Sequence, residues 1–395
     1  MRLSNARLSD GRTVSVSIEA NRITEVTPAP AEGQDLEGRL LLPGLIDGHV
    51  HLDKTLLGLP WRPHEAGDSV RDRIETERRL RPTLGRSVQQ RATALLERMA
   101  SFGTVALRTH VDIDDSVGLV NLEAVLEVVE AFRGRMEIQV VAFPQSGIVT
   151  RPGVPALLDE ALRMGVQVMG GLDPTTIDGD PAAHLDVVFG LAARHGAGVD
   201  IHLHEQGALG NATLRDIAAR TGAAGMAGQV VVSHAFSLGT PDGEDFAATA
   251  DALAGAGVAI LTAAPGAAPM PPVLPLRARG VVVFAGSDNI RDLWSPFGTG
   301  DMLQRAFLVA QRQGFRTDAD IAVAFDLCTG AAAQALGLAP RRVMAGAPAD
   351  LVAVRAETLA EAVALCPDGR LVWQAGRPLG SSGSAGGSAG APRSP

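Results

Sequence analysis

Closely spaced histidine pairs mark the positions in this sequence that could do chemistry. His49 and His51 are separated by one residue, and His202 and His204 repeat this spacing. Because side chains alternate between the two faces of a β-strand, His49 and His51 point to the same side if their segment is a strand. Two imidazoles side by side at the end of a buried strand provide half of a metal site.

The other half of such a site is predicted from residues at the ends of later apolar segments. His202 and Asp288 both occupy such positions. Three imidazoles and one carboxylate suit zinc, and they suit ferrous iron equally well. We therefore predict that His49, His51, His202 and Asp288 bind a divalent metal ion, zinc or iron, and leave a further position for water.

A hydrolytic site also needs groups that hold the attacking water and move its protons. We predict that Asp288 and His234 hold this water. Glu205 follows His202 by three residues, where the expected strand gives way to a loop. Glu205 is therefore predicted to turn back over the site and carry the proton; the alternative is a loop carboxylate in solvent.

Short apolar strands alternating with helical stretches would position these residues. We expect helices at 122–133, 155–164, 182–194, 214–220 and 246–254, and strands at 45–53, 105–111, 137–144, 167–173, 199–205, 230–236, 258–263 and 280–288. Eight β-then-α units predict an α/β fold, a TIM-like (β/α)₈ barrel, whose catalytic residues lie at the C-terminal strand ends. Six of the nine histidines fall at such ends. A doubly wound open sheet is the alternative, but no Gly-rich phosphate loop follows the first strand.

The two chain ends share the alternating pattern of half-exposed strands. We expect them to pair into one small β-sandwich domain, formed by residues 1–42 and 345–379, beside a catalytic barrel at 43–344. Residues 65–100 have a helical pattern rich in Arg and Glu, which indicates a solvated face. The Gly/Ser-rich tail at 380–395 is predicted to be disordered.

Composition limits the partners and the compartment. The formal net charge of −9 argues against a nucleic-acid partner. The sequence shows no apolar stretch of membrane-spanning length and no leader pattern at its N-terminal end. Cys328 and Cys366 lie far apart and read as buried thiols in a reducing compartment, so we expect a cytoplasmic protein. Whether it forms a homo-oligomer is left open.

Six short motifs stand at the expected strand ends. They are Gly48-His49-Val50-His51-Leu52-Asp53-Lys54, Arg108-Thr109-His110-Val111-Asp112, Phe143-Pro144-Gln145-Ser146-Gly147, Asp200-Ile201-His202-Leu203-His204-Glu205, Ser233-His234-Ala235 and Ser287-Asp288-Asn289-Ile290-Arg291-Asp292. Together they resemble the amidohydrolase superfamily and, within it, the cytosine deaminase-like branch. The resemblance covers nearly the whole chain and implies the same metal ligands, with Glu205 as proton shuttle and His234 steadying the attacking hydroxide.

The resemblance also implies contacts to a substrate. Gln145 would hydrogen-bond the carbonyl and ring nitrogen of a pyrimidine through its amide. His110, Asn289 and Trp294 are candidate substrate-binding residues, and His204 is a candidate for the pocket or its surroundings; for His110, His204 and Trp294 the alternative is ordinary packing. Asn289 stands where cytosine deaminases typically carry a second aspartate, and the segment from 287 to 298 is similar to the isopropylammelide amidohydrolases.

The lysine count bears on the number of metal ions. Binuclear members of this superfamily typically bridge two metals with a carboxylated lysine on strand four. Lys54 is the only lysine among 35 basic residues, and it follows the first strand. The resemblance therefore implies a single metal ion, with Lys54 near the site or in its loop rather than acting as a nucleophile.

These observations predict a metal-dependent hydrolytic deaminase of a small nitrogen heterocycle, most similar to cytosine deaminase. A metal-bound hydroxide would attack the ring carbon and an amine would leave. The alternatives are an s-triazine N-alkylamine amidohydrolase, a ring opener of the lactamase or hydantoinase type, and a catalytically inactive barrel kept as a scaffold. The last is disfavoured because every ligand position is filled.

Overall fold

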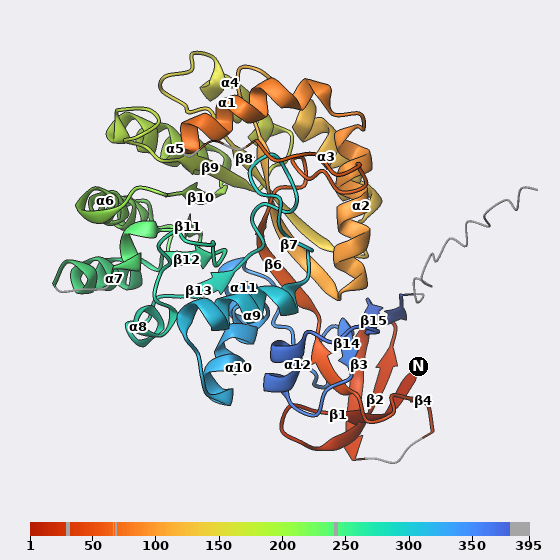
Figure 1. Ribbon diagram of the computed structural model, residues 1–395. Coiled ribbons are helices and arrows are strands. Elements are labelled where there is room, and N and C mark those ends of the chain that lie inside the picture. Colours follow the sequence, from red (N-terminus) through yellow and green to blue (C-terminus); the bar gives the residue numbers. More distant parts are fainter. Residues whose placement is uncertain (29–31, 66, 68, 241–243, 380–395) are drawn as a thin grey trace, which may run out of the picture.

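Eight parallel strands form a nearly closed barrel in the computed structural model of the chain, which describes residues 1–28, 32–65, 67, 69–240 and 244–379 (Figure 1). Neighbouring strands follow one another in chain order. They are β6 (Leu45–Val50), β7 (Thr104–Asp112), β8 (Glu137–Phe143), β9 (Val168–Leu172), β10 (Gly198–His202), β11 (Val230–Ser233), β12 (Ala259–Thr262) and β13 (Val283–Ala285). Each overlaps a predicted strand and differs from it mainly at the ends.

The barrel strands are buried on both faces. Every residue of β6, β7 and β9 is buried, which explains why these segments do not show the alternation of a half-exposed strand. Parallel register brings strand ends to one level: His202 at the end of β10 pairs with Ser233 at the end of β11. The side chains that follow these ends therefore gather at one mouth of the barrel.

The barrel closes between β6 and β13, where the two backbones approach closely. Val50 forms an isolated parallel bridge with Asp288, just past β13. A Cβ atom added to Gly286 would lie 2.5 Å from the backbone nitrogen of His49. Glycine is required there because a side chain would push apart the two segments that carry His49 and Asp288.

Helices cover the outside of the barrel (Figure 1). The α1 and α2 helices begin at capping boxes formed by Ser69 and Ser87. The helices expected from the sequence correspond to α3–α7, whereas α8–α12 were not expected individually. The helices are α1 (Val70–Leu80), η1 (Arg81–Thr83), α2 (Val88–Ser101), α3 (Val120–Ala131), α4 (Val154–Arg163), α5 (Pro181–His195), α6 (Gly207–Ala224), η2 (Phe236–Gly239), α7 (Glu244–Ala256), α8 (Val273–Ala278), α9 (Met302–Gln313), α10 (Asp318–Asp326), α11 (Gly330–Ala335) and α12 (Leu359–Leu365).

A second, mixed sheet joins the two chain ends. Its order is β16-β15-β14-β5-β1-β2-β3, and β4 pairs with β1. Antiparallel pairing of β5 with β14, with Leu42 opposite Val352, connects the N-terminal and C-terminal parts. The strands are β1 (Arg2–Arg7), β2 (Thr13–Glu19), β3 (Arg22–Pro28), β4 (Gln34–Asp35), β5 (Leu40–Pro43), β14 (Leu351–Val354), β15 (Leu371–Gln374) and β16 (Arg377–Pro378).

The prediction of a (β/α)₈ barrel with a small β domain built from both chain ends is confirmed. This domain has its own apolar core around Leu3, Val16, Leu351 and Trp373. The exact domain boundaries stay predictions, and the tail at 380–395 lies outside the described residues. Among the described helices, none is both long and apolar enough to cross a membrane.

Candidate active site

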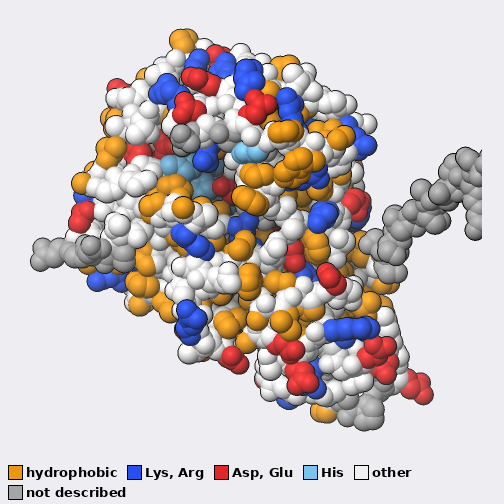
Figure 2. Space-filling model, viewed as in Figure 1, with side chains coloured by type: hydrophobic (Ala, Val, Ile, Leu, Met, Phe, Trp, Pro, Cys, Tyr) orange, Lys and Arg blue, Asp and Glu red, His pale blue; other side chains and the backbone are white. Residues whose placement is uncertain are grey.

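A cavity of about 340 Å³ opens at the C-terminal ends of the barrel strands. Figure 2 shows histidine side chains, in pale blue, within a hollow on this side of the molecule. Catalytic residues of (β/α)₈ barrels lie at this end. The lining residues that the sequence had singled out are His51, Lys54, Gln145, His202, His204, His234, Asp288, Asn289 and Trp294.

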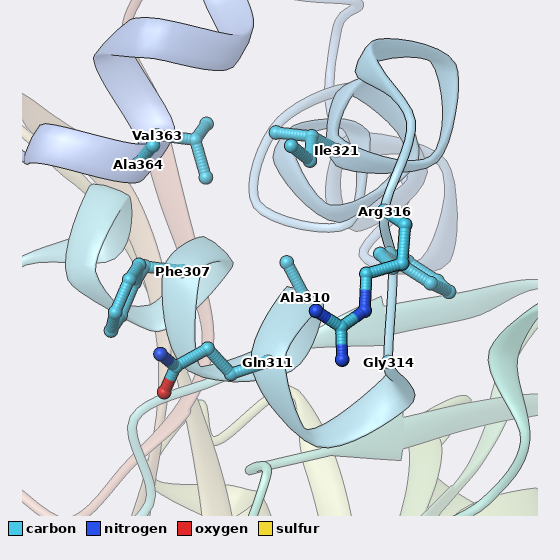
Figure 3. Close-up of a pocket in the computed structure, with 9 residues that line it drawn as sticks. Phe307, Ala310, Gln311, Gly314, Arg316, Ile321, Val363 and Ala364 are labelled. Atoms are coloured by element: carbon cyan, nitrogen blue, oxygen red, sulfur yellow. The ribbon is translucent and has the colours of Figure 1, made fainter.

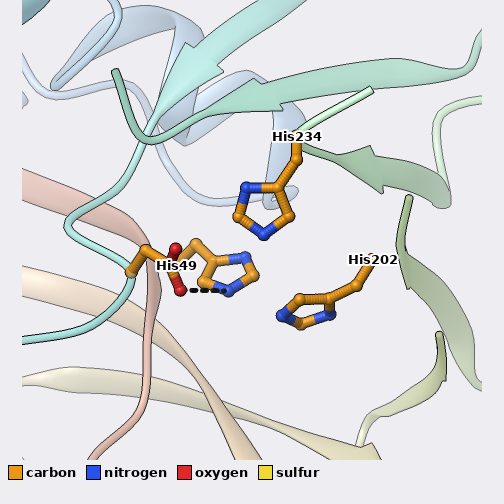
Figure 4. A group of neighbouring side chains, drawn as sticks. His49, His202 and His234 are labelled. Carbon is orange, nitrogen blue, oxygen red and sulfur yellow. Dashed lines mark ion pairs between the residues drawn. The ribbon is translucent and has the colours of Figure 1, made fainter. Parts of the chain in front are cut away.

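Imidazoles from three strands converge beside Asp288. Figure 4 shows the rings of His49, His202 and His234 facing one another, with an ion pair from His49 to the carboxylate. Each of these three rings and Asp288 offers an atom within 4.8 Å of the others. The Nε2 atoms of His49 and His51 are 3.3 Å apart, and Asp288 Oδ1 lies 3.6 Å and 3.3 Å from them. The structure thus brings together all four predicted ligands and His234.

The spacing and chemistry of these atoms fit a four-coordinate cation. Tetrahedral ligands with bonds of about 2.0–2.1 Å lie about 3.3–3.4 Å apart, close to the separations among His49, His51 and Asp288. The set whose atoms all lie within 4.8 Å of one another consists of His49, His202, His234 and Asp288. Among the described residues, both ring nitrogens of His202 and Nε2 of His234 are buried without a hydrogen-bond partner. Such orphaned groups are rare unless a ligand satisfies them. Burial holds the pKa of His202 well below its usual value and lowers that of His234 to about 4, so their lone pairs are available.

Two residues of the histidine and aspartate cluster have a strained backbone conformation. His234 has φ +73° and Asp288 has φ +59°, in the left-handed region that non-glycine residues seldom adopt. His234 directly follows the last residue of β11, so the chain turns as soon as the strand ends. Strain of this kind persists where the surrounding structure enforces it, and it concentrates at functional sites.

A buried hydrogen-bond chain fixes the orientation of His49. Its Nδ1 lies 3.0 Å from the hydroxyl of Ser233, which donates to Asp200 Oδ1 at 2.7 Å. Arg108 donates to the other oxygen of Asp200 at 2.9 Å. With Nδ1 donating to Ser233, the lone pair of His49 is on Nε2, the atom that faces Asp288.

His110 does not lie where a substrate-binding residue must lie. It is fully buried, is absent from the cavity lining, and stacks on His49 with ring centroids 3.8 Å apart. Its Nε2 is 3.7 Å from Asp200 Oδ2, and neither ring nitrogen has a hydrogen-bond partner among the described residues. His49, His110 and Asp200 also offer atoms within 4.8 Å of one another, so His110 packs behind the histidine cluster and does not line the cavity.

His204 is held in the cavity by Asp173. Its Nδ1 lies 2.8 Å from Asp173 Oδ2, and its backbone nitrogen donates to Oδ1 at 2.6 Å. The ring stacks on His234 with centroids 4.7 Å apart. Burial lowers the pKa of His204, but the charge and hydrogen bond of Asp173 outweigh burial and raise it above its usual value.

Glu205 is placed away from the cavity, contrary to the expectation that it turns back over the site. It is 3% exposed and is not among the cavity-lining residues. Its Oε1 accepts hydrogen bonds from the backbone nitrogens of Thr175 and Thr176 at 2.7 and 3.0 Å, and its Oε2 accepts one from Thr213 at 2.9 Å. The strand β10 ends at His202, earlier than predicted, so the chain has already turned when it reaches Glu205.

Lys54 and Gln145 form a further polar part of the cavity lining. Lys54 Nζ donates to Gln145 Oε1 and lies 3.2 Å from Asp112 Oδ1. The indole ring of Trp294 lies 4.9 Å from the ammonium group. Burial lowers the pKa of Lys54, but Asp112 and Glu77 outweigh burial, so the side chain stays charged. Sequence reasoning missed Glu77, although its spacing to the apolar residues three positions on either side could have indicated a buried face.

A second cavity of about 370 Å³ lies between α9, α10 and α12 (Figure 3). Phe307, Ala310, Ile321 and Val363 line it, and its polar groups are Gln311 and Arg316. The described residues that line it include no carboxylate, imidazole or thiol that could carry a reaction.

Comparison with known proteins places this architecture in a family. The solved N-isopropylammelide isopropylaminohydrolase from Burkholderia multivorans is 44% identical, with a TM-score of 0.92 over 96% of this chain and 97% of that one. The 5-methylcytosine deaminase from Klebsiella pneumoniae, solved with 5-fluorocytosine, is 25% identical, with a TM-score of 0.86 over 96% and 97%. The Escherichia coli protein YahJ is 35% identical over 77% of this chain and 66% of its own length. The model of the amidohydrolase family matches residues 32–379, and this chain therefore belongs to the amidohydrolase family.

Proposed function

We propose that the protein is a metal-dependent hydrolase that removes an amine from a ring carbon of a small, oxo-substituted nitrogen heterocycle. The observation that carries the proposal is the convergence of four imidazoles and Asp288 beside a cavity that Lys54 and Gln145 also line. His49, His51, His202 and Asp288 would hold one zinc or iron ion. Such an ion, when bound, lowers the pKa of water toward neutrality and so supplies a nucleophile.

The chain's own residues would then position the water and move its protons. Asp288 and His234 lie beside each other in the cavity and would orient the attacking oxygen. His204, held through Nδ1 by Asp173, has its Nε2 available to protonate the leaving nitrogen. A carbon–oxygen bond forms and a carbon–nitrogen bond breaks. One proton of the water passes to the departing amine and the other to the ring nitrogen, which becomes part of a lactam. We assign the proton transfer to His204 in place of Glu205, because both oxygens of Glu205 are already engaged outside the cavity.

The shape of the cavity favours an alkylamine as leaving group. Phe236 lies beside the proposed acid, with ring centroids 5.3 Å from His204 and 5.8 Å from His234. Pro265 and Ala268 continue this apolar wall. An alkyl substituent on the leaving nitrogen would contact these side chains, whereas ammonia would leave them without a partner. We therefore propose an N-alkylammelide as substrate, in keeping with the relative that is 44% identical.

Cytosine deamination is the second candidate. The amide of Gln145 lies in the cavity and suits an oxopyrimidine as well as an oxotriazine. The 25% identical 5-methylcytosine deaminase supports this candidate. Incubating metal-loaded protein with N-isopropylammelide, cytosine and isocytosine, and measuring isopropylamine and ammonia separately, distinguishes the two. Absence of both products with every substrate would refute the proposed function.

The assignment of the proton carrier is tested with two variants. His204→Gln should lower kcat by about 100-fold or more, the usual contribution of a general acid, with the metal content unchanged. Glu205→Gln should keep a much larger share of kcat, because its carboxylate does not reach the cavity. Greater loss in Glu205→Gln than in His204→Gln would return the role to Glu205.

A further inference from the structure

One buried carboxylate contacts three residues that line the cavity. Glu77 lies on α1 and is 3% exposed. Its Oε2 accepts hydrogen bonds from Gln145 Nε2 at 2.7 Å and from the indole nitrogen of Trp294 at 2.5 Å, and lies 3.4 Å from Lys54 Nζ. These three partners all line the cavity. They come from separate parts of the chain, so Glu77 fixes their relative positions.

Arg81, one helical turn after Glu77, balances the charge of the Glu77 carboxylate. It lies 3.3 Å from Glu77 Oε1 and donates to Asp112 Oδ2 at 2.7 Å. Two cations, Lys54 and Arg81, therefore stand against two carboxylates. Burial alone would raise the pKa of Glu77, but Lys54 and Arg81 outweigh burial and lower it to about 2. Glu77 is thus a permanent hydrogen-bond acceptor.

The network leaves the Gln145 amide only one orientation. Glu77 is ionised, Asp112 Oδ2 already accepts from Arg81, and an ammonium group only donates. The NH₂ group must therefore face Glu77 and Asp112, and the carbonyl oxygen must face Lys54. Nε2 lies 2.7 Å from Glu77 Oε2 and 3.1 Å from Asp112 Oδ2, which uses both of its hydrogens. What Gln145 can still offer a ligand is the second lone pair of Oε1. Gln145 is therefore an acceptor for the ligand and not a donor.

We propose that Glu77 is a specificity-determining positioning residue, which turns Gln145 so that the cavity selects heterocycles presenting a ring N–H next to a ring carbonyl. The N–H would donate to Gln145 Oε1, and the neighbouring carbonyl oxygen would lie against the charge of Lys54. This lactam edge is present in oxotriazines and in the lactam form of oxopyrimidines. The inference rests on the proposed function for the class of ligand, and it concerns recognition of the ring, not the step that releases the amine.

The test uses Glu77→Gln and a matched control on the same helix. Glu75→Gln removes a carboxylate that is exposed on α1. The probe is cyanuric acid, which carries the lactam edge on every side and is the product expected from N-isopropylammelide. Calorimetry on the metal-loaded proteins should show about tenfold weaker binding for Glu77→Gln, the usual effect of losing one well-placed hydrogen bond, and no change for Glu75→Gln. Metal content should be equal in all three.

A double-mutant comparison separates positioning from general damage. If Glu77 acts through Gln145, adding Glu77→Gln to Gln145→Ala should cost little further affinity. Effects that add in full, or a Glu77→Gln protein that binds like wild type, would overturn the inference. If Glu77→Gln does not fold, Glu77→Asp keeps the buried charge while withdrawing the carboxylate from Gln145, and it serves the same comparison.

The outcome separates this inference from the proposed function. A wild-type protein that binds cyanuric acid but releases no amine would refute the proposed function and leave the role of Glu77 to be decided by the variants. A wild-type protein that releases isopropylamine but does not bind cyanuric acid would refute the inference. N-Isopropylammelide methylated at each ring nitrogen gives a further check: wild type should discriminate against one of these analogues about tenfold more strongly than Glu77→Gln does.

Discussion

Replacing Ser233 with alanine should weaken metal binding without unfolding the barrel. The Ser233 hydroxyl is the only described group between His49 Nδ1 and Asp200, at 3.0 and 2.7 Å. It fixes which ring nitrogen of His49 carries the proton, and therefore which one is free for a metal ion. Without it, His49 loses an acceptor and Asp200 loses a donor, while Arg108 still pairs with Asp200.

The contacts of Ser233 indicate the size of the loss in metal affinity and of the loss in folding stability. Removing a partner that orients a metal-bound histidine typically costs 10–100-fold in metal affinity, or about 1.4–2.7 kcal/mol. Leaving a buried polar group unsatisfied costs about 1–3 kcal/mol of folding stability. We expect Ser233→Ala to show both losses. The loss of affinity should appear as a greater share of metal removed at a given chelator concentration.

The assay compares wild type, Ser233→Ala and Ser237→Ala. Ser237 is equally buried, but its hydroxyl has no hydrogen-bond partner within the described residues, so its removal should leave metal affinity unchanged. Metal affinity is measured by competition with a chromogenic chelator, and stability by urea unfolding of the metal-free proteins. Equal metal affinity in Ser233→Ala and Ser237→Ala would refute the claim that this chain orients His49.

Three further predictions concern the metal ion, the close contact between β6 and the segment after β13, and the loop that contains Asp178. Chelation should lower the melting temperature and abolish turnover, and one equivalent of zinc or ferrous iron should restore both, as metal analysis and thermal melts will show. Gly286→Ala should destabilise the fold by about 1–3 kcal/mol in urea unfolding because its Cβ would meet His49, whereas Gly255→Ala, in open space on α7, should not. Burial raises the pKa of Asp178, but its hydrogen bonds from His184 and nearby backbone outweigh this and lower it. The ionised Asp178 therefore contributes its whole stabilising effect above about pH 4, the pKa of an aspartate in the unfolded chain. The difference in free energy of unfolding between wild type and Asp178→Asn, measured by urea titration, should be constant there and decrease as the pH falls further.

The barrel and its histidine cluster could be predicted because burial and strand geometry determine which residue types occur at nearby positions in the sequence. Residues on a strand buried on both faces are mostly apolar, so clustered histidines such as His49 and His202 at the end of an apolar run stand out. The parallel register then brings such ends together without further information from the sequence. Gln145, Asn289 and Trp294 were expected from the resemblance to the amidohydrolases and not from strand geometry, and all three line the cavity.

Glu77 and Glu205 could not be placed in this way, because their environment comes from distant segments. The stretch at 65–100 is rich in charge and was interpreted as a solvated face, yet Glu77 is buried between Ile74 and Leu80 on one side of α1. Its partners Gln145 and Trp294 are far away in the sequence. A buried carboxylate is recognisable only when the groups that compensate its charge are known.

Glu205 follows His202 closely in the sequence, but its carboxylate supports a neighbouring loop instead of entering the cavity. Its Oε1 accepts hydrogen bonds from Thr175 and Thr176, in the loop that begins at Asp173. Asp173 in turn holds His204 through both of its oxygens, at 2.6 and 2.8 Å. Glu205 therefore acts on the cavity through two links, by fixing the loop that fixes the imidazole. A partial loss of activity in Glu205→Gln is thus compatible with a structural role. Its kinetic signature would be a small fall in kcat together with reduced stability, and not the large fall in kcat at full stability that a missing proton carrier causes.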